Sequence, residues 1–435
     1  MTDATRRAID RAILAGLRLP KQKRWEVEES MDELARLAES AGAEVLARVL
    51  QERGRPTPPL RFGKGKVEEM RGLAADLGAN LLISDDPLSP IQERNVQRAV
   101  RVRVIDRTAL ILDIFAQRAR TSEGKLQVEL AQLTYLLPRL VRQWAHLERL
   151  GGGIGTRGPG ESQLESDRRL IRRRIAQIHG ALRGVQRHRR LLREHRRDLG
   201  LPVVALVGYT NAGKTTLLNR LAGAAAPTAD QLFVTLDPAA RFVTGSGHSS
   251  FVLTDTVGFI QKLPTQLVAA FKATLEELGE ADLLLHVVDV SHPLVREQVG
   301  AVYAVLEELG LGAKPTVTAL NKVDRLPEPD GFLRQLESEG GVAISALRGA
   351  GIEALHGRID AMLRSTRLAC RLRVPYERAG VLSTLYARGR VAAREDRPDG
   401  IWLDVELPRS LAGLVARYRV DGVAEAAVSG VGVAP

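Results

Sequence analysis

The sequence predicts a multidomain α/β protein in four parts, and three observations indicate this fold class. Short apolar strand patterns alternate with helical patterns in residues 1–121 and again in residues 201–365, as is typical of parallel sheets covered by helices. Between them, residues 122–200 carry apolar seams at helical spacing, and residues 366–435 predict a small α+β unit. We therefore expect a small N-terminal α/β domain, an antiparallel helical hairpin, a domain with a mostly parallel sheet and a small C-terminal α+β domain.

The composition is that of a folded protein without a membrane span. Hydrophobic residues make up 44% and charged residues 26% of the 435 residues, and no apolar run reaches the roughly 18 residues that a membrane helix needs. Cys370 is the single cysteine, which excludes an internal disulfide and a cysteine-based metal site. We expect a cytoplasmic monomer, with peripheral association with a membrane left open.

The first domain is predicted from short strands that alternate with helices. Strand patterns cover residues 43–50, 81–84 and 102–105, and helical patterns cover residues 67–77 and 90–100. The stretch Gly63–Lys66 precedes the first of these helices. It is either a second phosphate or RNA contact or simply a basic loop, and the residues leave both interpretations open.

The helical hairpin is predicted from two apolar seams. The first seam alternates spacings of four and three residues through Leu126, Leu130, Leu133, Leu137, Leu140, Trp144 and Leu147. The second runs through Ile171, Ile175, Ile178, Leu182 and Val185. Pro138 should kink the first helix, and the glycine-rich run Gly151–Gly160 should end it and form the tip. Two independent amphipathic helices remain the alternative, in which the glycine run is a mere linker.

The positive charge is concentrated on the second helix of this hairpin. From residue 168 to 200 there are 12 arginines and two acidic residues, a local net of +10, whereas residues 201–365 carry 13 basic and 18 acidic residues, a net of −5. Internal ion pairs are too few to neutralise such a run, so the charge predicts a polyanion partner such as nucleic acid. The alternative is an ordinary solvated helix face.

The remaining elements follow a βαβ order and then an α+β order. Strands of a parallel sheet are predicted at residues 203–207, 251–255, 283–289, 316–321 and 342–345. The tail predicts a strand near residues 371–374, a helix at 380–388, a hairpin turning at 398–400 and a helix near 410–418. The role of this tail is not indicated by its residues.

A complete phosphate-binding loop follows the strand at residues 203–207. It consists of Gly208, Tyr209, Thr210, Asn211, Ala212, Gly213, Lys214, Thr215 and Thr216. Glycines let backbone N–H groups approach phosphate oxygens closely. Lys214 would face the β- and γ-phosphates, and the Thr215 hydroxyl would bind Mg²⁺. The strand before the loop and the helical pattern after it are the context that this motif requires.

Three further motifs follow in the order of a nucleotide switch, and they consist of Asp255-Thr256-Val257-Gly258, Asn321-Lys322-Val323-Asp324 and Ser345-Ala346-Leu347. Asp255 can hold Mg²⁺ through water, and the Gly258 amide can meet the γ-phosphate. Asp324 can accept the ring N–H and the exocyclic amine of guanine, a donor pair that adenine lacks. Asn321 would contact the base edge and Lys322 its face, while residues 345–347 would close over the base. The series predicts guanine-nucleotide binding.

This set of motifs resembles the GTPases of the Ras-like superfamily, in particular those related to translation factors. The resemblance makes Leu232–Pro238 the first switch segment, with Thr235 as the residue that reaches Mg²⁺ and the γ-phosphate. It implies a Mg²⁺-dependent hydrolase of GTP to GDP, with Lys214, Thr235 and Gly258 as its catalytic groups.

One position departs from the usual pattern of such GTPases. Many of them have a water-orienting Gln directly after the glycine of the second switch, where this chain has Phe259. A phenyl ring cannot orient water, so we expect a low intrinsic rate that depends on stimulation by a partner, which the family resemblance described next would make the ribosome; another side chain acting unaided remains the alternative. Asn211 resembles the asparagine of potassium-assisted GTPases and would then help to hold K⁺, or else it braces the loop.

Outside these motifs the chain resembles one family, the ribosome-associated GTPase HflX. The resemblance lies in Phe62–Lys66, Ser89–Asn95, Val104–Thr108, Leu112–Phe115, Ala119–Thr121, Lys125–Gln132, Gly158–Glu161 and Glu165–Arg169, and with the GTPase motifs it covers about residues 20–365. It implies binding to the large (50S) ribosomal subunit and separation of stalled or idle 70S ribosomes under stress. The glycine-rich tip would then point toward the peptidyl-transferase region of ribosomal RNA.

The expected RNA contacts lie on the hairpin, at Arg157, Arg168, Arg169, Arg172, Arg173 and Arg174. Two other functions remain open. A GTP-controlled scaffold for ribosome assembly or RNA modification would share the motifs, and so would a signalling switch with a protein partner, although the arginine-rich hairpin argues against the latter. An additional ATP-using activity of the N-terminal domain also stays open.

Overall fold

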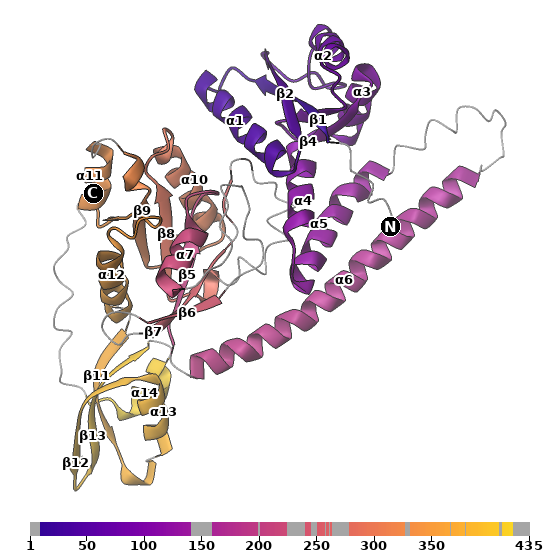
Figure 1. Ribbon diagram of the computed structural model, residues 1–435. Coiled ribbons are helices and arrows are strands. Elements are labelled where there is room, and N and C mark those ends of the chain that lie inside the picture. The colour runs from indigo at the N-terminus through magenta and orange to yellow at the C-terminus, as the bar shows by residue number, and fades with distance from the viewer. Residues whose placement is uncertain are drawn as a thin grey trace, which may run out of the picture.

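The computed structural model describes residues 9–140, 159–198, 201–223, 240–244, 250–256, 258–260, 262, 278–326, 331–365, 367–378, 380–408 and 411–420. Three sheets organise these residues, with helices packed on them and one long helix that runs across the molecule (Figure 1). The α/β multidomain fold expected from the sequence is confirmed. Within the described ranges, no helix is both long and apolar enough to cross a membrane.

The N-terminal domain is a four-stranded, fully parallel sheet in the order β2-β1-β3-β4. Its elements are β1 (Arg11–Arg18), α1 (Arg24–Ser40), β2 (Glu44–Glu52), α2 (Lys64–Leu77), β3 (Leu81–Ser84), α3 (Pro90–Val100), β4 (Arg103–Asp106) and α4 (Arg107–Arg118). The sequence patterns missed β1, α1 and α4. Strand β1 is buried at six successive positions, so it lacks the alternation that distinguishes a strand from a buried helix.

Helices α5 (Ser122–Leu140) and α6 (Pro159–Asp198) pack against each other. Pro138 lies inside α5, whose described part continues past it to Leu140. Helix α5 also buries Val128 and Ala131 in the apolar core of the N-terminal domain, so this core continues beyond residue 121. The predicted glycine-rich tip lies mostly outside the described residues. Helix α6 is 40 residues long, which corresponds to about 60 Å at 1.5 Å per residue.

The domain of residues 201–365 has a six-stranded sheet in the order β10-β9-β8-β5-β7-β6, parallel except for the edge strand β6. Its elements are β5 (Val203–Val207), α7 (Lys214–Ala222), β6 (Ala240–Thr244), β7 (Ser250–Thr254), β8 (Leu283–Asp289), α10 (Val295–Glu308), β9 (Thr316–Asn321), α11 (Gly331–Ser338), β10 (Val342–Ala343) and α12 (Ile352–Ser365). Strand β6 was missed because Val243 is its one buried residue. Strand β10 is shorter than predicted, since the chain turns away into the Ser345 loop.

The C-terminal domain is a three-stranded antiparallel sheet in the order β11-β13-β12, with two short helices packed on its apolar face. Its elements are β11 (Arg367–Val374), α13 (Gly380–Arg388), β12 (Arg390–Arg397), β13 (Gly400–Pro408) and α14 (Ala412–Val415). The hairpin turns where it was predicted, and Gly400 allows this with φ = 134°. Cys370 lies in the buried core of this sheet.

Candidate nucleotide-binding site

The predicted site motifs converge at one edge of the six-stranded sheet. The phosphate loop follows β5, Asp255 follows β7, Asn321 ends β9, and Ser345 follows β10. Because these strands are parallel, their carboxyl ends meet at the same edge, where open α/β sheets bind their ligands. Motifs separated by more than 130 residues therefore form one site.

Two glycines of the phosphate loop are required by the close approach of other groups. Gly208 has φ = 148° and Gly213 has φ = 95°, conformations that disfavour other residues. A β-carbon on Gly208 would lie 2.3 Å from the Val287 carbonyl oxygen, and one on Gly213 would lie 2.3 Å from Asn321 Nδ2. The loop thus packs directly on β8 and on the base-reading motif, which fixes its position relative to the rest of the site.

Lys214 begins α7 and points back over the loop. Its Nζ donates to the carbonyl oxygens of Gly208 (3.0 Å) and Tyr209 (2.7 Å). An ammonium has three N–H groups, so one more is available in this geometry for a phosphate oxygen. Burial lowers the pKa of Lys214 to about 8, although the Asp255 charge opposes that shift. The sequence-based role of Lys214 is compatible with this geometry.

Thr215 and Asp255 form the pair that could hold Mg²⁺. The Thr215 hydroxyl donates to Asp255 Oδ2 at 3.0 Å, and the Thr256 backbone N–H donates to Asp255 Oδ1 at 3.0 Å. A hydroxyl and a carboxylate oxygen are ligands that Mg²⁺ accepts when phosphates and water complete its shell. The donor set therefore fits the metal, as one or two protein ligands beside a bound nucleotide.

Asn321 joins the phosphate loop to the base loop. Its Nδ2 donates to the Ala212 carbonyl at 2.8 Å, and its Oδ1 accepts from the Ala346 backbone N–H at 2.9 Å. Lys322, with φ = 69°, donates to Asp289 Oδ2 at 2.6 Å, which holds its stem in place. The predicted residues Asn321 and Ala346 are therefore brought together, and Asp289 is a further residue of the site that the sequence motifs do not include.

Asp324 is held in its ionised form. A hydrogen bond from Ser345 lowers its pKa below the usual value, and Arg348 lies 4.0 Å away. The Ser345 hydroxyl also accepts from the Arg348 backbone N–H at 3.0 Å, which closes the turn of residues 345–350. A carboxylate that stays charged is the acceptor that a guanine edge needs.

Arg220, on α7, is a residue of the site that the sequence motifs did not predict. Its Nε donates to the Ala346 carbonyl at 3.2 Å and its Nη2 to the Leu347 carbonyl at 2.5 Å. The helix that begins with Lys214 thereby supports the base loop as well. No local signal in the sequence marks this arginine, because its partners lie more than 120 residues away.

The segment that begins at Gly258, which the sequence predicts to be the second switch, is hydrogen-bonded to the phosphate loop through the backbone of Phe259. The Phe259 N–H donates to the Gly208 carbonyl at 3.1 Å, and its carbonyl accepts from the Thr210 N–H at 2.7 Å. The Phe259 ring is buried beside Val207 and Leu284. The ring thus lies in the core of the domain, as part of its packing.

The remaining predicted site residues either lie outside the described part of the chain or lie on another element. Thr235, Val257 and Arg157 lie outside the described residues. Arg168, Arg169, Arg172, Arg173 and Arg174 all lie on α6, away from the nucleotide motifs. Arg174 forms a two-pronged ion pair with Glu129 of α5, at 2.6 and 2.8 Å. That contact was not foreseen, and it ties one of the expected RNA-binding arginines to the neighbouring helix.

Comparison with known proteins agrees with this geometry. Family models match four consecutive stretches: a GTP-binding GTPase N-terminal region at residues 28–116, its middle region at 118–196, a 50S ribosome-binding GTPase at 203–322 and an HflX C-terminal domain at 332–433. The fold and the site thus define a GTP-hydrolysing enzyme with a ribosome-binding type of GTPase domain.

Curated relatives that bear the name GTPase HflX are similar over most of the chain. That of Lacrimispora saccharolytica is 45% identical over 89% of this chain and 91% of its own. That of Escherichia coli is 46% identical over 87% and 90%, and that of Magnetococcus marinus is 44% identical over 96% and 98%. The chain belongs to the GTPase HflX family, as the sequence resemblance predicted.

Proposed function

We propose that this GTPase binds the large (50S) ribosomal subunit when it carries GTP, and that it separates stalled or idle 70S ribosomes into subunits under stress. The observation that supports this most is the arrangement of α6, an arginine-rich helix of 40 residues in the same chain as the guanine motifs. Tight binding of the protein to one subunit can displace the contacts between the two subunits, and the bound nucleotide determines whether that binding is tight. Hydrolysis to GDP then accompanies release.

The proposal assigns the site residues as follows. The phosphate loop and Lys214 hold the phosphates, Thr215 and Asp255 hold Mg²⁺ directly or through water, and Thr235 would complete the metal shell. Asp324 and Asn321 read the guanine edge, while Lys322 and residues 345–347 cover the base. When bound, Mg²⁺ would offset the negative charge that develops on the phosphates.

The same proposal places K⁺ beside Asn211. This residue has φ = 61° and is exposed, and its amide oxygen is a group that can bind a monovalent cation. GTP turnover measured in matched KCl and NaCl buffers tests the assignment, with faster turnover in K⁺ expected. Equal turnover in the two salts would contradict it.

The RNA contact is assigned to the exposed arginines of α6. Arg169, Arg172 and Arg173 are exposed, whereas Arg168 is half-buried and Arg174 is paired with Glu129. Phosphate contacts of this kind are strong and salt-sensitive. The tip that includes Arg157 is assigned to the peptidyl-transferase region of the RNA. We propose that the protein acts as a monomer in the cytoplasm.

Density-gradient sedimentation of 70S ribosomes tests the proposal as a whole. With a non-hydrolysable GTP analogue, addition of the protein should convert 70S particles into 50S and 30S particles. With GDP, the 70S peak should remain. An unchanged 70S peak in both would contradict ribosome separation and would favour an assembly or RNA-modification scaffold.

A paired variant tests the RNA contact separately. Arg172→Glu with Arg173→Glu should weaken co-sedimentation with 50S particles at least tenfold, because each change replaces an attraction to phosphate by a repulsion. GTP binding should be unchanged. The matched control is Arg358→Glu with Arg364→Glu on α12, two exposed arginines of the GTPase domain. Equal loss in both pairs would contradict a specific role of α6.

A further inference from the structure

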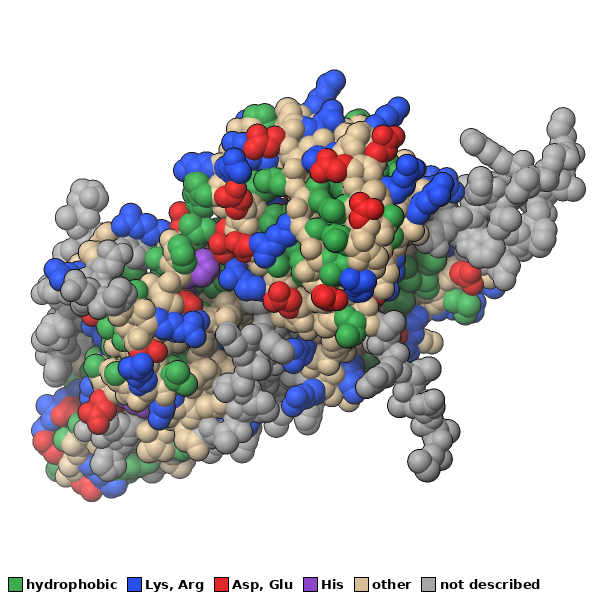
Figure 2. Space-filling model, turned by 45° about the horizontal axis from the view of Figure 1, so that its top comes forward, with side chains coloured by type: hydrophobic (Ala, Val, Ile, Leu, Met, Phe, Trp, Pro, Cys, Tyr) green, Lys and Arg blue, Asp and Glu red, His purple; other side chains and the backbone are tan. Residues whose placement is uncertain are grey.

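Two side chains of the nucleotide site reach into the N-terminal domain. The Tyr209 hydroxyl, in the phosphate loop, donates to Glu33 of α1. Lys262, just after the second switch, forms an ion pair with Asp85 and lies 3.3 Å from Asp86, both directly after β3. Tyr209 is 6% exposed, so its contact with Glu33 is buried. Figure 2 shows acidic, basic and histidine side chains side by side where the two domains meet.

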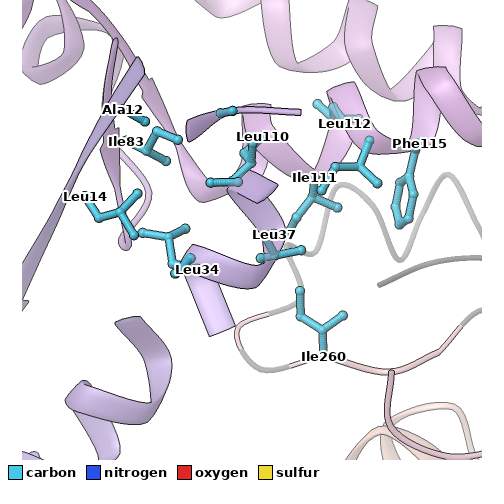
Figure 3. Packing of buried hydrophobic residues seen from close by; sticks show 14 of the residues in the cluster. Ala12, Leu14, Leu34, Leu37, Ile83, Leu110, Ile111, Leu112, Phe115 and Ile260 are labelled. Atoms are coloured by element: carbon cyan, nitrogen blue, oxygen red, sulfur yellow. The ribbon is translucent and has the colours of Figure 1, made fainter. Parts of the chain in front are cut away.

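An apolar contact accompanies these polar ones. Ile260, two residues before Lys262, is 5% exposed and belongs to the core of the N-terminal domain. Figure 3 shows it beside Leu37, on a segment separate from the helices that carry Ile111 and Phe115. The segment after Gly258 therefore contacts the N-terminal domain through one apolar side chain, Ile260, and one charged side chain, Lys262.

A buried arginine organises the acidic partners. Arg107, the first residue of α4, is 1% exposed and donates to Asp85 (2.8 Å), Glu33 (2.8 Å) and the Ser30 carbonyl (2.7 Å). Burial alone would raise the pKa of Asp85, but Arg107 and Lys262 outweigh it, so the pKa lies below its usual value. Both Asp85 and Glu33 thus have their places fixed from within the N-terminal domain.

The charges of this cluster balance only when Lys262 is present. Glu33 and Asp85 are two buried anions, Arg107 is one buried cation, and Asp86 has its own partner in Arg61 at 2.9 Å. Withdrawal of Lys262 would leave an uncompensated negative charge in a buried place, which is strongly unfavourable. The N-terminal domain therefore holds Lys262 where it is, close to the described residues 258–260.

This position of the switch bears directly on the γ-phosphate. A β-carbon on Gly258 would lie 2.8 Å from Lys214 Nζ and 2.9 Å from Thr210 Cα. Gly258 and Lys214 Nζ thus lie close together, and a γ-phosphate that both contact would enter between them, so we expect Gly258 to move outward when GTP binds. Gly258 is two residues from Ile260 and four from Lys262, and the shift pulls on both anchors.

We propose that Tyr209 and Lys262 are positioning residues of the GTPase, which through Glu33, Asp85 and Asp86 hold Gly258 against Lys214 and so set the preference of the site between GDP and GTP. We call these five residues the interdomain latch. The inference rests on the proposed assignment of Lys214 and Gly258 to the γ-phosphate. By linkage, a bound γ-phosphate weakens the latch as much as the latch weakens GTP binding.

The test measures the affinities of the full-length protein for GDP and for a non-hydrolysable GTP analogue, without ribosomes. Lys262→Met keeps the length of the side chain and removes its charge. We expect the affinity ratio to shift about tenfold toward the GTP analogue, as for the loss of a partly buried charged hydrogen bond. Tyr209→Phe, which removes only the hydroxyl, should shift it in the same direction by a smaller factor. Lys262→Arg should restore the wild-type ratio.

Kinetics and controls separate positioning from a structural role. The KM for GTP should fall in Lys262→Met with little change in kcat, a split that simple loss of folded protein would not produce. Lys125→Met on α5 and Tyr376→Phe in the C-terminal domain are matched controls that should leave the ratio unchanged. An unchanged ratio in folded Lys262→Met and Tyr209→Phe would overturn the proposal. Because no ribosome is present, failure of ribosome separation would not produce that result.

Discussion

Arg220 joins the helix that follows the phosphate loop to the predicted base loop through a single side chain. It lies on α7, whose first residue is Lys214, and its guanidinium donates to the carbonyls of Ala346 and Leu347. The Ala346 N–H is held from the other side by Asn321. The backbone of the base loop is therefore fixed on both of its polar edges before any base arrives, which reduces the ordering that binding requires.

Replacement of this arginine should speed nucleotide release. Arg220→Gln loses the paired N–H groups that hold the base loop, so the dissociation rate of GDP should rise about tenfold, in keeping with the loss of charged hydrogen bonds. Stopped-flow release of a fluorescent GDP analogue measures the rate. Arg364→Gln, an exposed arginine of the same domain, is the control. An unchanged rate in Arg220→Gln would show that the loop does not depend on this contact.

Asp324 provides a second prediction at the residue scale. Asp324→Asn replaces an acceptor by an amide that cannot accept from both the ring N–H and the exocyclic amine of guanine. GDP affinity should fall about 100-fold, and xanthosine diphosphate should become the better ligand. Equilibrium titration with the two diphosphates measures this exchange of preference. Asp396→Asn, an exposed site of the C-terminal domain, should bind GDP like the unaltered protein.

At the scale of elements, a glycine stands at each end of the segment formed by the phosphate loop and α7, and the two glycines are required for different reasons. Gly208 has a positive φ and no space for a side chain, because its β-carbon would lie 2.3 Å from the Val287 carbonyl. Gly223, which ends α7, has φ = 60° and nothing within 4 Å of its β-carbon position. A side chain at Gly223 would therefore meet backbone strain alone, whereas a side chain at Gly208 would also clash with β8.

Alanine at these positions should therefore destabilise the fold unequally. Gly223→Ala adds only the strain of a left-handed residue, about 1 kcal/mol, whereas Gly208→Ala adds overpacking against β8 and should cost about 2–4 kcal/mol in total. Urea unfolding of both variants gives the free energies of unfolding. Equal losses would contradict the close approach between the loop and β8.

The elements also explain what the sequence could predict. The strands of the parallel sheet and the four nucleotide motifs are local patterns, and β8 and β9 lie at the residues predicted for them. Strand β1 was missed because a fully buried run has no period, and β6 because an exposed edge strand has little apolar signal. The contacts of Tyr209, Arg220 and Lys262 were missed because their partners are more than 120 residues away.

At the scale of the whole molecule, the salt dependence of ribosome binding should depend on the positive charge of α6. The logarithm of the binding constant falls linearly with the logarithm of salt concentration, by about 0.7–0.9 per phosphate contact. Arg172→Gln with Arg173→Gln should therefore lower that slope by about 1.4–1.8. Binding to 50S particles over a range of KCl concentrations measures it. An unaltered slope would place the phosphate contacts on other parts of the protein.

One connection gives α6 a mechanical consequence. The helix ends at Asp198, β5 begins at Val203, and β5 leads straight to the phosphate loop. The far end of α6 lies across the molecule from that loop, and α13 of the C-terminal domain also packs on this helix. A stiff rod joined so closely to the central strand acts as a lever. If the subunits bind its distant end, as proposed above, force applied there would reach the groups that hold the triphosphate, and the ribosome could then influence when the protein is released.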